Sequence, residues 1–352
     1  MYYKKASAQA GKLKSKEKVT ILAVETSCDE TSAAVVVNGR TVLSNVVASQ
    51  IEVHKRFGGV VPEVASRNHI MCINNVVDEA IVKAGIKLND IDAIAVTYGA
   101  GLVGALLVGV STAKAFAYAL GVPLIAVNHI KAHIAANYVE HSGLKPPFIC
   151  LVVSGGHTAI VKVTSPTHFE LLGQTQDDAI GECYDKVARV LGLGYPGGPI
   201  IERTAAGGAG DIVFVRQDSF GKSCDTSFSG LKTAVINYIN SKRQAGAELD
   251  MANICASFQA AACNGLIEKT VKAAKDYGLK TICLAGGVAA NKYLRNGLAE
   301  RAAKEGIEVL APTMAMCTDN AAMIGALGYF NLLAGVGISE LSLKAEPNIE
   351  LK

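Results

Sequence analysis

Short apolar runs alternate with longer stretches of helical periodicity along the first third of the chain. The runs are rich in β-branched residues and have the length of buried strands. From this pattern we predict strands at 19–25, 31–37, 93–98 and 122–127, and helices at 62–84, 102–120 and from 129 onward. Strands that alternate with helices indicate an α/β fold.

The pattern then restarts with a second hairpin. The segments ILAVETSCDETSAAVVV and ICLVVSGGHTAIVKV lie about 128 residues apart, and each consists of an apolar strand, a small polar turn and an apolar return strand. A repeat of this kind predicts two related lobes with a cleft between them. We expect an N-terminal lobe at 19–127, completed by a C-terminal helix at about 320–345, and a second lobe at 128–319 with a largely helical insertion at about 178–277.

Composition limits the partners and the compartment. Half of the 352 residues are apolar and only 18% are charged, so the chain can bury sizeable cores. Residues 1–18 carry six lysines and one glutamate without the apolar region of a secretory signal, and we expect a flexible basic tail there. Because the chain is +3 overall and this tail is +5, the remainder is −2, so a nucleic-acid site needs a local patch or a partner protein. Nine cysteines without a C-x-x-C pair are typical of reduced thiols in a cytoplasmic protein.

An uncharged segment at 94–113 is long enough to cross a bilayer. Glycines interrupt it, and a buried strand that turns into a buried helix explains it better, so we expect no membrane span. Gly99, Gly101 and Gly104 have the spacing of a dinucleotide-binding loop, but no acidic residue follows at the end of the next strand, where Asn128 stands. Close helix packing, or a loop beside a ligand, accounts for the glycines better.

Two histidines four positions apart are the clearest metal-binding signal. His129 and His133 lie on one face of the predicted helix, so both imidazoles can hold one ion. The metalloprotease pattern H-E-x-x-H is absent, because Ile130 follows the first histidine. Asp319 could supply a third ligand and leave positions open for chemistry. The plainer interpretation is two core or surface histidines and an aspartate beside a helix cap.

Two further segments place polar groups at turns. Asp29 and Glu30 crowd the first hairpin turn, which is either an ordinary polar turn or a place where a cation or a proton transfer uses both carboxylates. Ser154, Gly155 and Gly156 form the second hairpin turn, where exposed backbone N–H groups can hold an anion, or where the glycines simply permit a tight turn.

The later part of the chain holds several candidate ligand residues. Asn291 follows a glycine pair that opens a helix, so it can bond a nucleotide or cap the helix. Asp185 can form an ordinary surface ion pair. Gly198 lies in a rigid Pro-Gly-Gly-Pro loop, and Glu202 follows on the next helix.

Taken together, these segments resemble one family. The motifs ETSCDET, PEVASRNH, GLVGALLVG, NHIKAH, VSGGHT, DDAIGECYDKVAR, GYPGGP, SFSGLKTA and AGGVAANKYLR occur in that family's order over about residues 19–335. The chain resembles the bacterial tRNA N6-adenosine threonylcarbamoyltransferases of the TsaD family, formerly described as glycoproteases.

The resemblance implies an actin-like ATPase (ASKHA) fold with two ribonuclease-H-like lobes. It implies transfer of the threonylcarbamoyl group from threonylcarbamoyl-adenylate to the N6 amine of the adenosine 3′ of the anticodon, in tRNAs that read ANN codons. It also implies partner proteins of the TsaB and TsaE type, and ATP, ADP or AMP as possible occupants of the cleft.

The resemblance also assigns residues. It implies that Fe²⁺ or Zn²⁺ is held by His129, His133 and Asp319, and that Asp29 and Glu30 take part in catalysis. The positions that would bind the adenylate are Val152, Val153, Ser154, Gly155, Gly156, Asp185, Gly198, Glu202 and Asn291.

The sequence departs from the family pattern at three positions. Lys131 and Ala132 replace the usual Glu-Gly between the histidines, and Ala100 replaces a proline. None of these removes a ligand. Two other functions remain open from the residues alone: an ATP-dependent small-molecule kinase of the same fold, and a nucleotide-binding scaffold subunit without catalysis.

Overall fold

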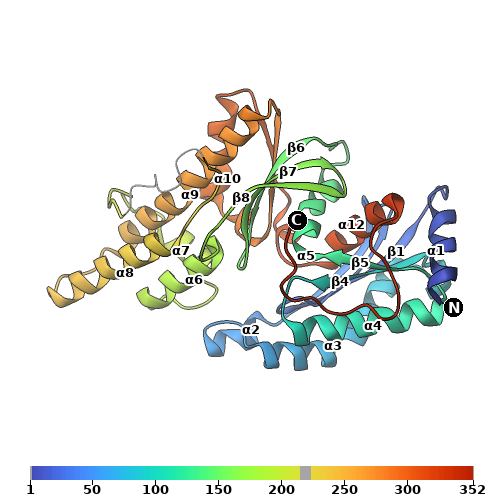
Figure 1. Ribbon diagram of the computed structural model, residues 1–352. Helices are drawn as coiled ribbons and strands as arrows, with labels where there is room; N and C mark the ends of the chain where they lie inside the picture. The colour runs from blue at the N-terminus through green and yellow to red at the C-terminus, as the bar shows by residue number, and fades with distance from the viewer. Residues whose placement is uncertain (1, 215–222, 352) are drawn as a thin grey trace. The chain divides into compact units, whose positions relative to one another are not determined.

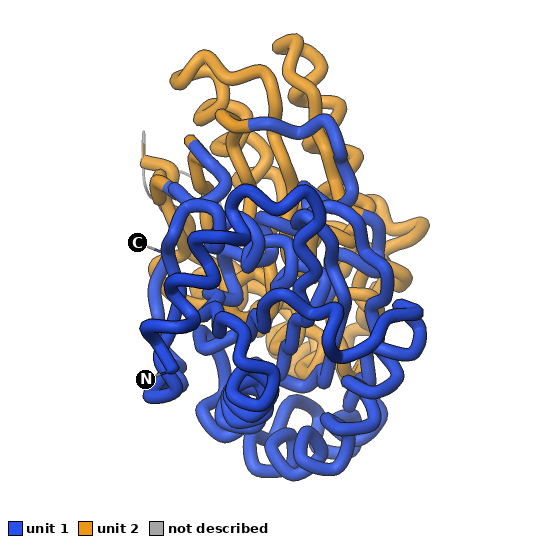
Figure 2. Tube along the Cα trace, turned by 90° about the vertical axis from the view of Figure 1, so that its right-hand side faces the viewer, with its two compact units in different colours: residues 1–145, 165–169, 313–352 blue, residues 146–164, 170–312 orange. Residues whose placement is uncertain are grey.

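The structure is a computed structural model that describes residues 2–214 and 223–351. The described chain separates into two compact units, coloured separately in Figure 2. Unit 1 comprises residues 1–145, 165–169 and 313–352, and unit 2 comprises residues 146–164 and 170–312.

Unit 1 is built on a six-stranded sheet with the order β11-β5-β4-β1-β2-β3. β1 and β2 form the antiparallel hairpin predicted from the sequence, and β4 and β5 continue the sheet in parallel with β1. The elements of this unit are α1 (Tyr2–Leu13), β1 (Thr20–Glu25), β2 (Glu30–Val37), β3 (Thr41–Ser49), α2 (Ile51–His54), the 3-10 turns Lys55–Phe57 and Leu88–Asp90, α3 (Pro62–Ala84), β4 (Ala93–Gly99), α4 (Val103–Leu120), β5 (Leu124–Asn128), α5 (His129–Glu140), α11 (Met314–Cys317), α12 (Ala321–Ala334) and β11 (Ile338–Ser339).

Helices cover both faces of the inner part of this sheet, which explains why β1 and β4 are apolar without alternation, whereas the edge strand β3 is partly exposed. Figure 1 shows α3 and α4 along one face and α12 on the other. Leu22 and Val24 of β1 belong to the core under α3 and α4, whereas the intervening Ala23 lies against Gly325 of α12. Residues of β1 therefore meet a helix on either face.

Unit 2 repeats the same strand order. Its sheet runs β10-β9-β6-β7-β8, again with an antiparallel hairpin (β6 and β7) whose first strand pairs in parallel with a later one (β9). The shared order confirms the internal repeat. Its elements are β6 (Phe148–Val153), β7 (Thr158–Ser165), β8 (His168–Gln174), α6 (Ile180–Leu191), α7 (Gly197–Thr204), α8 (Ser229–Gln244), α9 (Met251–Asp276), β9 (Thr281–Ala285), the 3-10 turn Gly287–Ala290, α10 (Lys292–Ala303) and β10 (Glu308–Leu310).

The N-terminal segment is the main correction to the predicted organisation. We expected a flexible tail at 1–18, but Tyr2–Leu13 forms helix α1. Ala6, Ala10 and Leu13 are buried, because they recur on one face of the helix. The Tyr2 hydroxyl donates a hydrogen bond to the carbonyl of Val122. The lysines occupy the opposite, exposed face, which is why the segment looks like a polar tail in sequence.

The boundaries of the units also differ from the expectation. We placed 128–319 in the second lobe, but α5 belongs to unit 1, because it packs on α12 and buries most of its residues there. Residues 313–319 also belong to unit 1. The last helix ends at Ala334 rather than near 345, and Gly335 in the left-handed conformation closes it.

The uncharged segment at 94–113 is a strand followed by a helix, as predicted. α4 is long and apolar enough to cross a membrane by composition alone. It packs against β4 and α3, and Leu106, Val110 and Ala113 lie in the core. A helix in this position is a core helix of unit 1.

Candidate active site

The two histidines open helix α5 directly after strand β5. The side chain of Asn128 caps the helix by accepting hydrogen bonds from the N–H groups of Ile130 and Lys131. Because the helix starts at His129, its first and fifth residues face the same side. Asn128 therefore sets where both imidazoles point.

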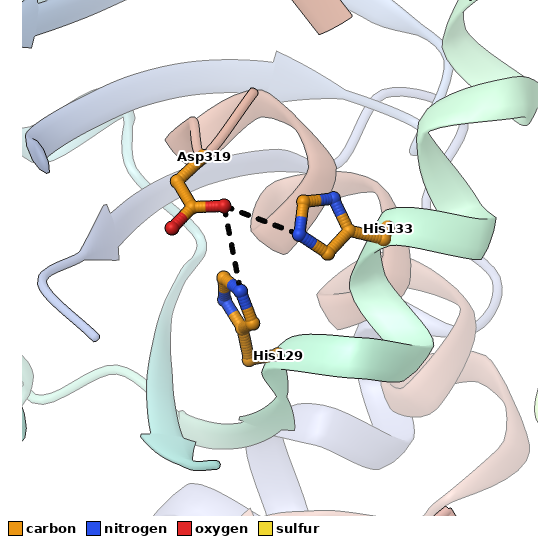
Figure 3. Close-up of side chains that lie close together, drawn as sticks. All are labelled: His129, His133 and Asp319. Atoms are coloured by element: carbon orange, nitrogen blue, oxygen red, sulfur yellow. Dashed lines mark ion pairs between the residues drawn. The ribbon is translucent and has the colours of Figure 1, made fainter. Parts of the chain in front are cut away.

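Asp319 reaches the histidines from the segment before α12. The cap of that helix is the next residue, Asn320, whose side chain accepts from the N–H of Met323. Asp319 is consequently not needed as a cap. Its Oδ1 lies 3.2 Å from Nε2 of His133 and 3.5 Å from Nε2 of His129, as Figure 3 shows.

These three residues have the arrangement of a metal site. One donor atom from each lies within 4.8 Å of the other two. His133 is 1% exposed, and its Nε2 faces the Asp319 carboxylate at 3.2 Å. The Nε2 atoms of both histidines therefore converge on one carboxylate, with which they can share a cation. Two nitrogens and one carboxylate suit Zn²⁺ or Fe²⁺ and leave coordination positions open.

The charges of Asp319 and the two histidines stabilise one another, which shifts the pKa values of Asp319 and His129. Burial alone raises the pKa of the Asp319 carboxyl, but His129 and His133 lower it well below its usual range. Burial lowers the pKa of His129, yet Asp319 and Glu25 raise it well above its usual range. The cluster therefore holds a carboxylate that attracts a cation, whether a proton or a metal ion.

Glu25, at the end of β1, lies behind His129. Its Oε2 is 3.0 Å from Nδ1 of His129, and its Oε1 accepts a hydrogen bond from the N–H of Ser27 at 2.5 Å. We did not single out Glu25 from the sequence as a site residue. The available signal was a carboxylate at the end of a wholly apolar strand.

The acidic turn between β1 and β2 lies in the same unit. Asp29 is 8% exposed, and Glu30 accepts a hydrogen bond from the Ser49 hydroxyl at 3.1 Å. Burial, with added repulsion from Asp319 and Asp29, raises the pKa of Glu30 to about 10. The structure thus places the turn within the electrostatic field of Asp319.

The second hairpin turn in unit 2 leaves its glycines open. Val152 and Val153 are buried at the end of β6, and Ser154 closes the turn by accepting from the N–H of His157. Gly155 and Gly156 are exposed, and a Cβ at either would meet nothing. Internal packing therefore does not require these glycines, which leaves room for a ligand against the backbone.

The other predicted ligand residues are held on elements of unit 2. Asp185 accepts a hydrogen bond from the N–H of Gly197. A Cβ added at the next residue, Gly198, would meet no other atom within 4 Å. Glu202 accepts from the N–H of Lys292 at 3.0 Å. Asn291 caps α10 through Leu294, which is the plainer of the two roles that we considered for it. Glu202 and Lys292 also line an open depression of about 420 Å³, with Gln259, Asn264, Tyr293 and Asn296.

The chain is similar to known proteins over nearly its full length. The family model described as "TsaD: tRNA N6-adenosine threonylcarbamoyltransferase" matches residues 41–326. The chain belongs to this family. Proteins with that name from Clostridium perfringens strain 13 and Clostridium botulinum strain Kyoto are each 55% identical to it, over 95% and 96% of this chain and 99% of theirs.

Solved structures confirm the predicted actin-like ATPase fold. HypF of T. kodakarensis has a TM-score of 0.62 at 16% identity, over 93% of this chain and 49% of its own. Component A of the (R)-2-hydroxyglutaryl-CoA dehydratase of Acidaminococcus fermentans has a TM-score of 0.54 at 13% identity, over 89% of this chain and 99% of its own. At these identities the likeness concerns the fold alone.

The departures from the family pattern lie around the cluster without interrupting it. Ala132 is buried between the histidines, and Lys131 lies 5.5 Å from the ring of Phe169. Burial lowers the pKa of Lys131. A lysine in this position places a basic side chain on α5 between the two histidines.

Proposed function

We propose that the protein transfers the threonylcarbamoyl group from threonylcarbamoyl-adenylate to the N6 amine of the adenosine 3′ of the anticodon in tRNAs that read ANN codons. Membership of the family named for this reaction supports the activity. The observation that carries the mechanism is the cluster of His129, His133 and Asp319, which a kinase or a passive scaffold does not require.

The three residues would hold one Zn²⁺ or Fe²⁺ ion through Nε2 of each histidine and the Asp319 carboxylate. Such an ion supplies a Lewis acid that polarises a carbonyl. The residues themselves keep the ligand atoms apart and oriented, because α5 fixes both imidazoles and the segment before α12 fixes the carboxylate. Asn128 both ends β5 and caps α5, so it fixes the start of the helix relative to the sheet.

Proton transfer falls to the acidic turn. The attacking N6 amine loses a proton as its C–N bond forms, and AMP leaves as the mixed anhydride breaks. Asp29 and Glu30 are the candidates for accepting that proton. A carboxyl with a pKa of about 10 is protonated at neutral pH and donates rather than accepts, so Glu30 in this state is an acid. A bound cation that offset Asp319 would remove one of the causes, besides burial, that keep it protonated.

The adenylate would bind to unit 2. The exposed N–H groups of Gly155 and Gly156 suit an anion, and Val152, Val153 and Ser154 position that turn at the end of β6. The remaining binding residues would be Asp185, Gly198, Glu202 and Asn291. ATP, ADP or AMP share the adenosine phosphate portion and would compete for the same residues.

Partners follow from the same proposal. Apart from its lysine-rich start, the chain has a formal charge of −2, which offers little attraction to a polyanion. Partner proteins of the TsaB and TsaE type would help to hold the tRNA, in a complex located in the cytoplasm.

A transfer assay tests the proposal. Purified protein, the presumed partners and an adenylate-forming enzyme are mixed with radiolabelled threonine, bicarbonate, ATP and an unmodified ANN-reading tRNA. We expect label in the tRNA and its loss with His129→Ala. Ser44→Ala, which removes a buried hydrogen bond to the carbonyl of Ala80 away from the cluster, should retain activity. Full transfer by metal-free His129→Ala would refute the role of the cluster, and bound adenylate without transfer would favour a scaffold.

A further inference from the structure

The carboxylate of Glu25 lies in a position that the fold alone does not explain. It ends β1, whose six residues are all buried, and the residue is 0% exposed. Burying a carboxylate costs several kcal/mol unless other groups satisfy its oxygens. An apolar residue would suit this strand better, so the carboxylate must serve a neighbouring group.

Three donors surround the two carboxylate oxygens. Oε1 accepts the N–H of Ser27, and Oε2 accepts the Thr97 hydroxyl, both at 2.5 Å. Oε2 also lies 3.0 Å from Nδ1 of His129. A carboxylate so held can only accept from the imidazole, which places the imidazole proton on Nδ1.

In the neutral imidazole with its proton on Nδ1, the lone pair of His129 lies on Nε2, where a metal ion would take the place of the second proton. That nitrogen is the one that faces Asp319, at 3.5 Å from Oδ1. A carboxylate bound to the outer nitrogen of a metal-binding histidine fixes its tautomer and ring orientation and raises its basicity. Glu25, His129 and Asp319 therefore form a line in which each group orients the next.

We propose that Glu25 is a positioning residue that fixes His129 with its proton on Nδ1, so that Nε2 is the metal ligand. This inference rests on the proposed function, because it requires a metal at His129, His133 and Asp319. Glu25 touches none of the reacting atoms, and its effect reaches them only through His129. The alternative is that Glu25 merely stabilises the end of β1.

Glu25→Gln separates these two roles, because glutamine has the same size but only one acceptor oxygen. If that oxygen keeps the Ser27 N–H, the amide NH₂ faces His129 and forces its Nδ1 to accept, which moves the ring proton to Nε2. If the oxygen faces His129 instead, the NH₂ opposes the N–H of Ser27 and the contact opens. The first arrangement removes the preset ligand, whereas the second keeps the proton on Nδ1 but loses the Ser27 contact that holds the side chain in place.

Metal affinity is the first measurement, made by competition between the protein and a chromophoric chelator for Zn²⁺. We expect Glu25→Gln to bind Zn²⁺ roughly 10–100-fold more weakly than the native chain. His129→Ala should lose binding altogether. Thr31→Val is the matched control, because Thr31 is also fully buried next to the acidic turn and hydrogen-bonds a histidine, His69, outside the cluster. It should bind Zn²⁺ with native affinity although its unfolding free energy falls.

The tautomer of His129 is the second measurement and does not depend on activity. Long-range ¹H–¹⁵N correlation spectra of the zinc-loaded, ¹⁵N-histidine-labelled protein show which ring nitrogen carries the proton. Protonated Nδ1 in the native chain, and its loss or displacement in Glu25→Gln, would support the inference. Native affinity and an unchanged spectrum in Glu25→Gln would overturn it while leaving the metal site intact.

Two further outcomes are decisive. If the native chain does not bind Zn²⁺, or His129→Ala binds it equally well, both the proposed metal site and this inference fail. If Glu25→Gln does not fold, as judged by circular dichroism, Glu25→Asp replaces it. The shorter side chain keeps the charge but cannot span both Ser27 and His129, so several-fold weaker binding is expected. Native affinity in Glu25→Asp would show that charge alone matters and would overturn the positioning role.

Discussion

Gly101 lies where the start of α4 meets the turn after β1, and its replacement with alanine tests what the glycine motif does. Its φ of 150° is a conformation that side chains rarely adopt. An alanine Cβ would lie 2.5 Å from the carbonyl oxygen of Ser27 and 3.0 Å from its Cα. That oxygen already accepts the N–H of Leu102 at 2.7 Å, so the backbone cannot move away freely.

The expected cost has two parts. Backbone strain contributes about 1–3 kcal/mol, and forcing a methyl group into a packed contact contributes about 1–3 kcal/mol. We therefore expect Gly101→Ala to lower the free energy of unfolding by about 2–6 kcal/mol. For a unit of this size the melting temperature should fall by roughly 4–24 °C.

Gly104→Ala is the matched control, three residues further along the same motif. A Cβ there would meet the Oγ and, at 3.3 Å, the Cβ of Ser66, a partly exposed side chain that can rotate at the cost of its hydrogen bond to the carbonyl of Pro62. Urea denaturation followed by circular dichroism should show a change within about 1 kcal/mol for this variant. Equal stability of the two variants would refute the packing interpretation. A loss of adenylate binding by Gly101→Ala at native stability would instead assign the motif to a ligand loop.

Three other predictions concern α1, the acidic turn and the metal. Leu13→Ala should lower the unfolding free energy by about 2–4 kcal/mol in urea titrations, because Leu13 is 6% exposed, whereas the exposed Lys12→Ala should be neutral. The folded-state pKa of Glu30, about 10, lies above its usual value of 4.5. Between these two pH values the unfolded chain binds fewer protons than the folded chain. Glu30 therefore lowers the free energy of unfolding progressively as pH rises from 4.5 to 10. Chelator-treated Glu30→Gln should therefore gain stability over the native chain between pH 6 and pH 9 in urea titrations, and a constant difference would contradict this. Zinc at 100 times its dissociation constant should stabilise the native chain by about 2.7 kcal/mol, seen as a chelator-sensitive melting temperature that His133→Ala lacks.

The sequence predicted the fold where apolar patterns were unambiguous. Strands buried on both faces, such as β1 and β4, are continuous apolar runs, and their helices carry clear periodicity. The repeat of the two hairpins also predicted two related units, and the two sheets share a strand order. These features depend on local pattern, which is why they could be predicted without a structure.

Features that depend on distant contacts were harder to predict. Helix α1 looks like a basic tail because only three small or apolar residues anchor it, and the surface that receives them includes residues more than 100 positions away. The assignment of α5 to unit 1 depends on its packing with α12, which no local pattern shows. Sequence reasoning paired His129 with His133 by their spacing and offered Asp319 as a third ligand, but only the fold places their donor atoms within 4.8 Å.

The topology of unit 1 explains why Glu25 lies behind His129. β1, β4 and β5 are neighbours and run parallel, so their carboxyl ends meet at the same edge of the sheet. Glu25 ends β1, Thr97 lies near the end of β4, and His129 follows β5 directly. Three adjacent strands thus deliver the carboxylate, the hydroxyl that holds it and the imidazole that it orients. Once the strand order is known, residues that orient a metal ligand can be sought in the sequence. They are polar residues at the carboxyl ends of neighbouring parallel strands.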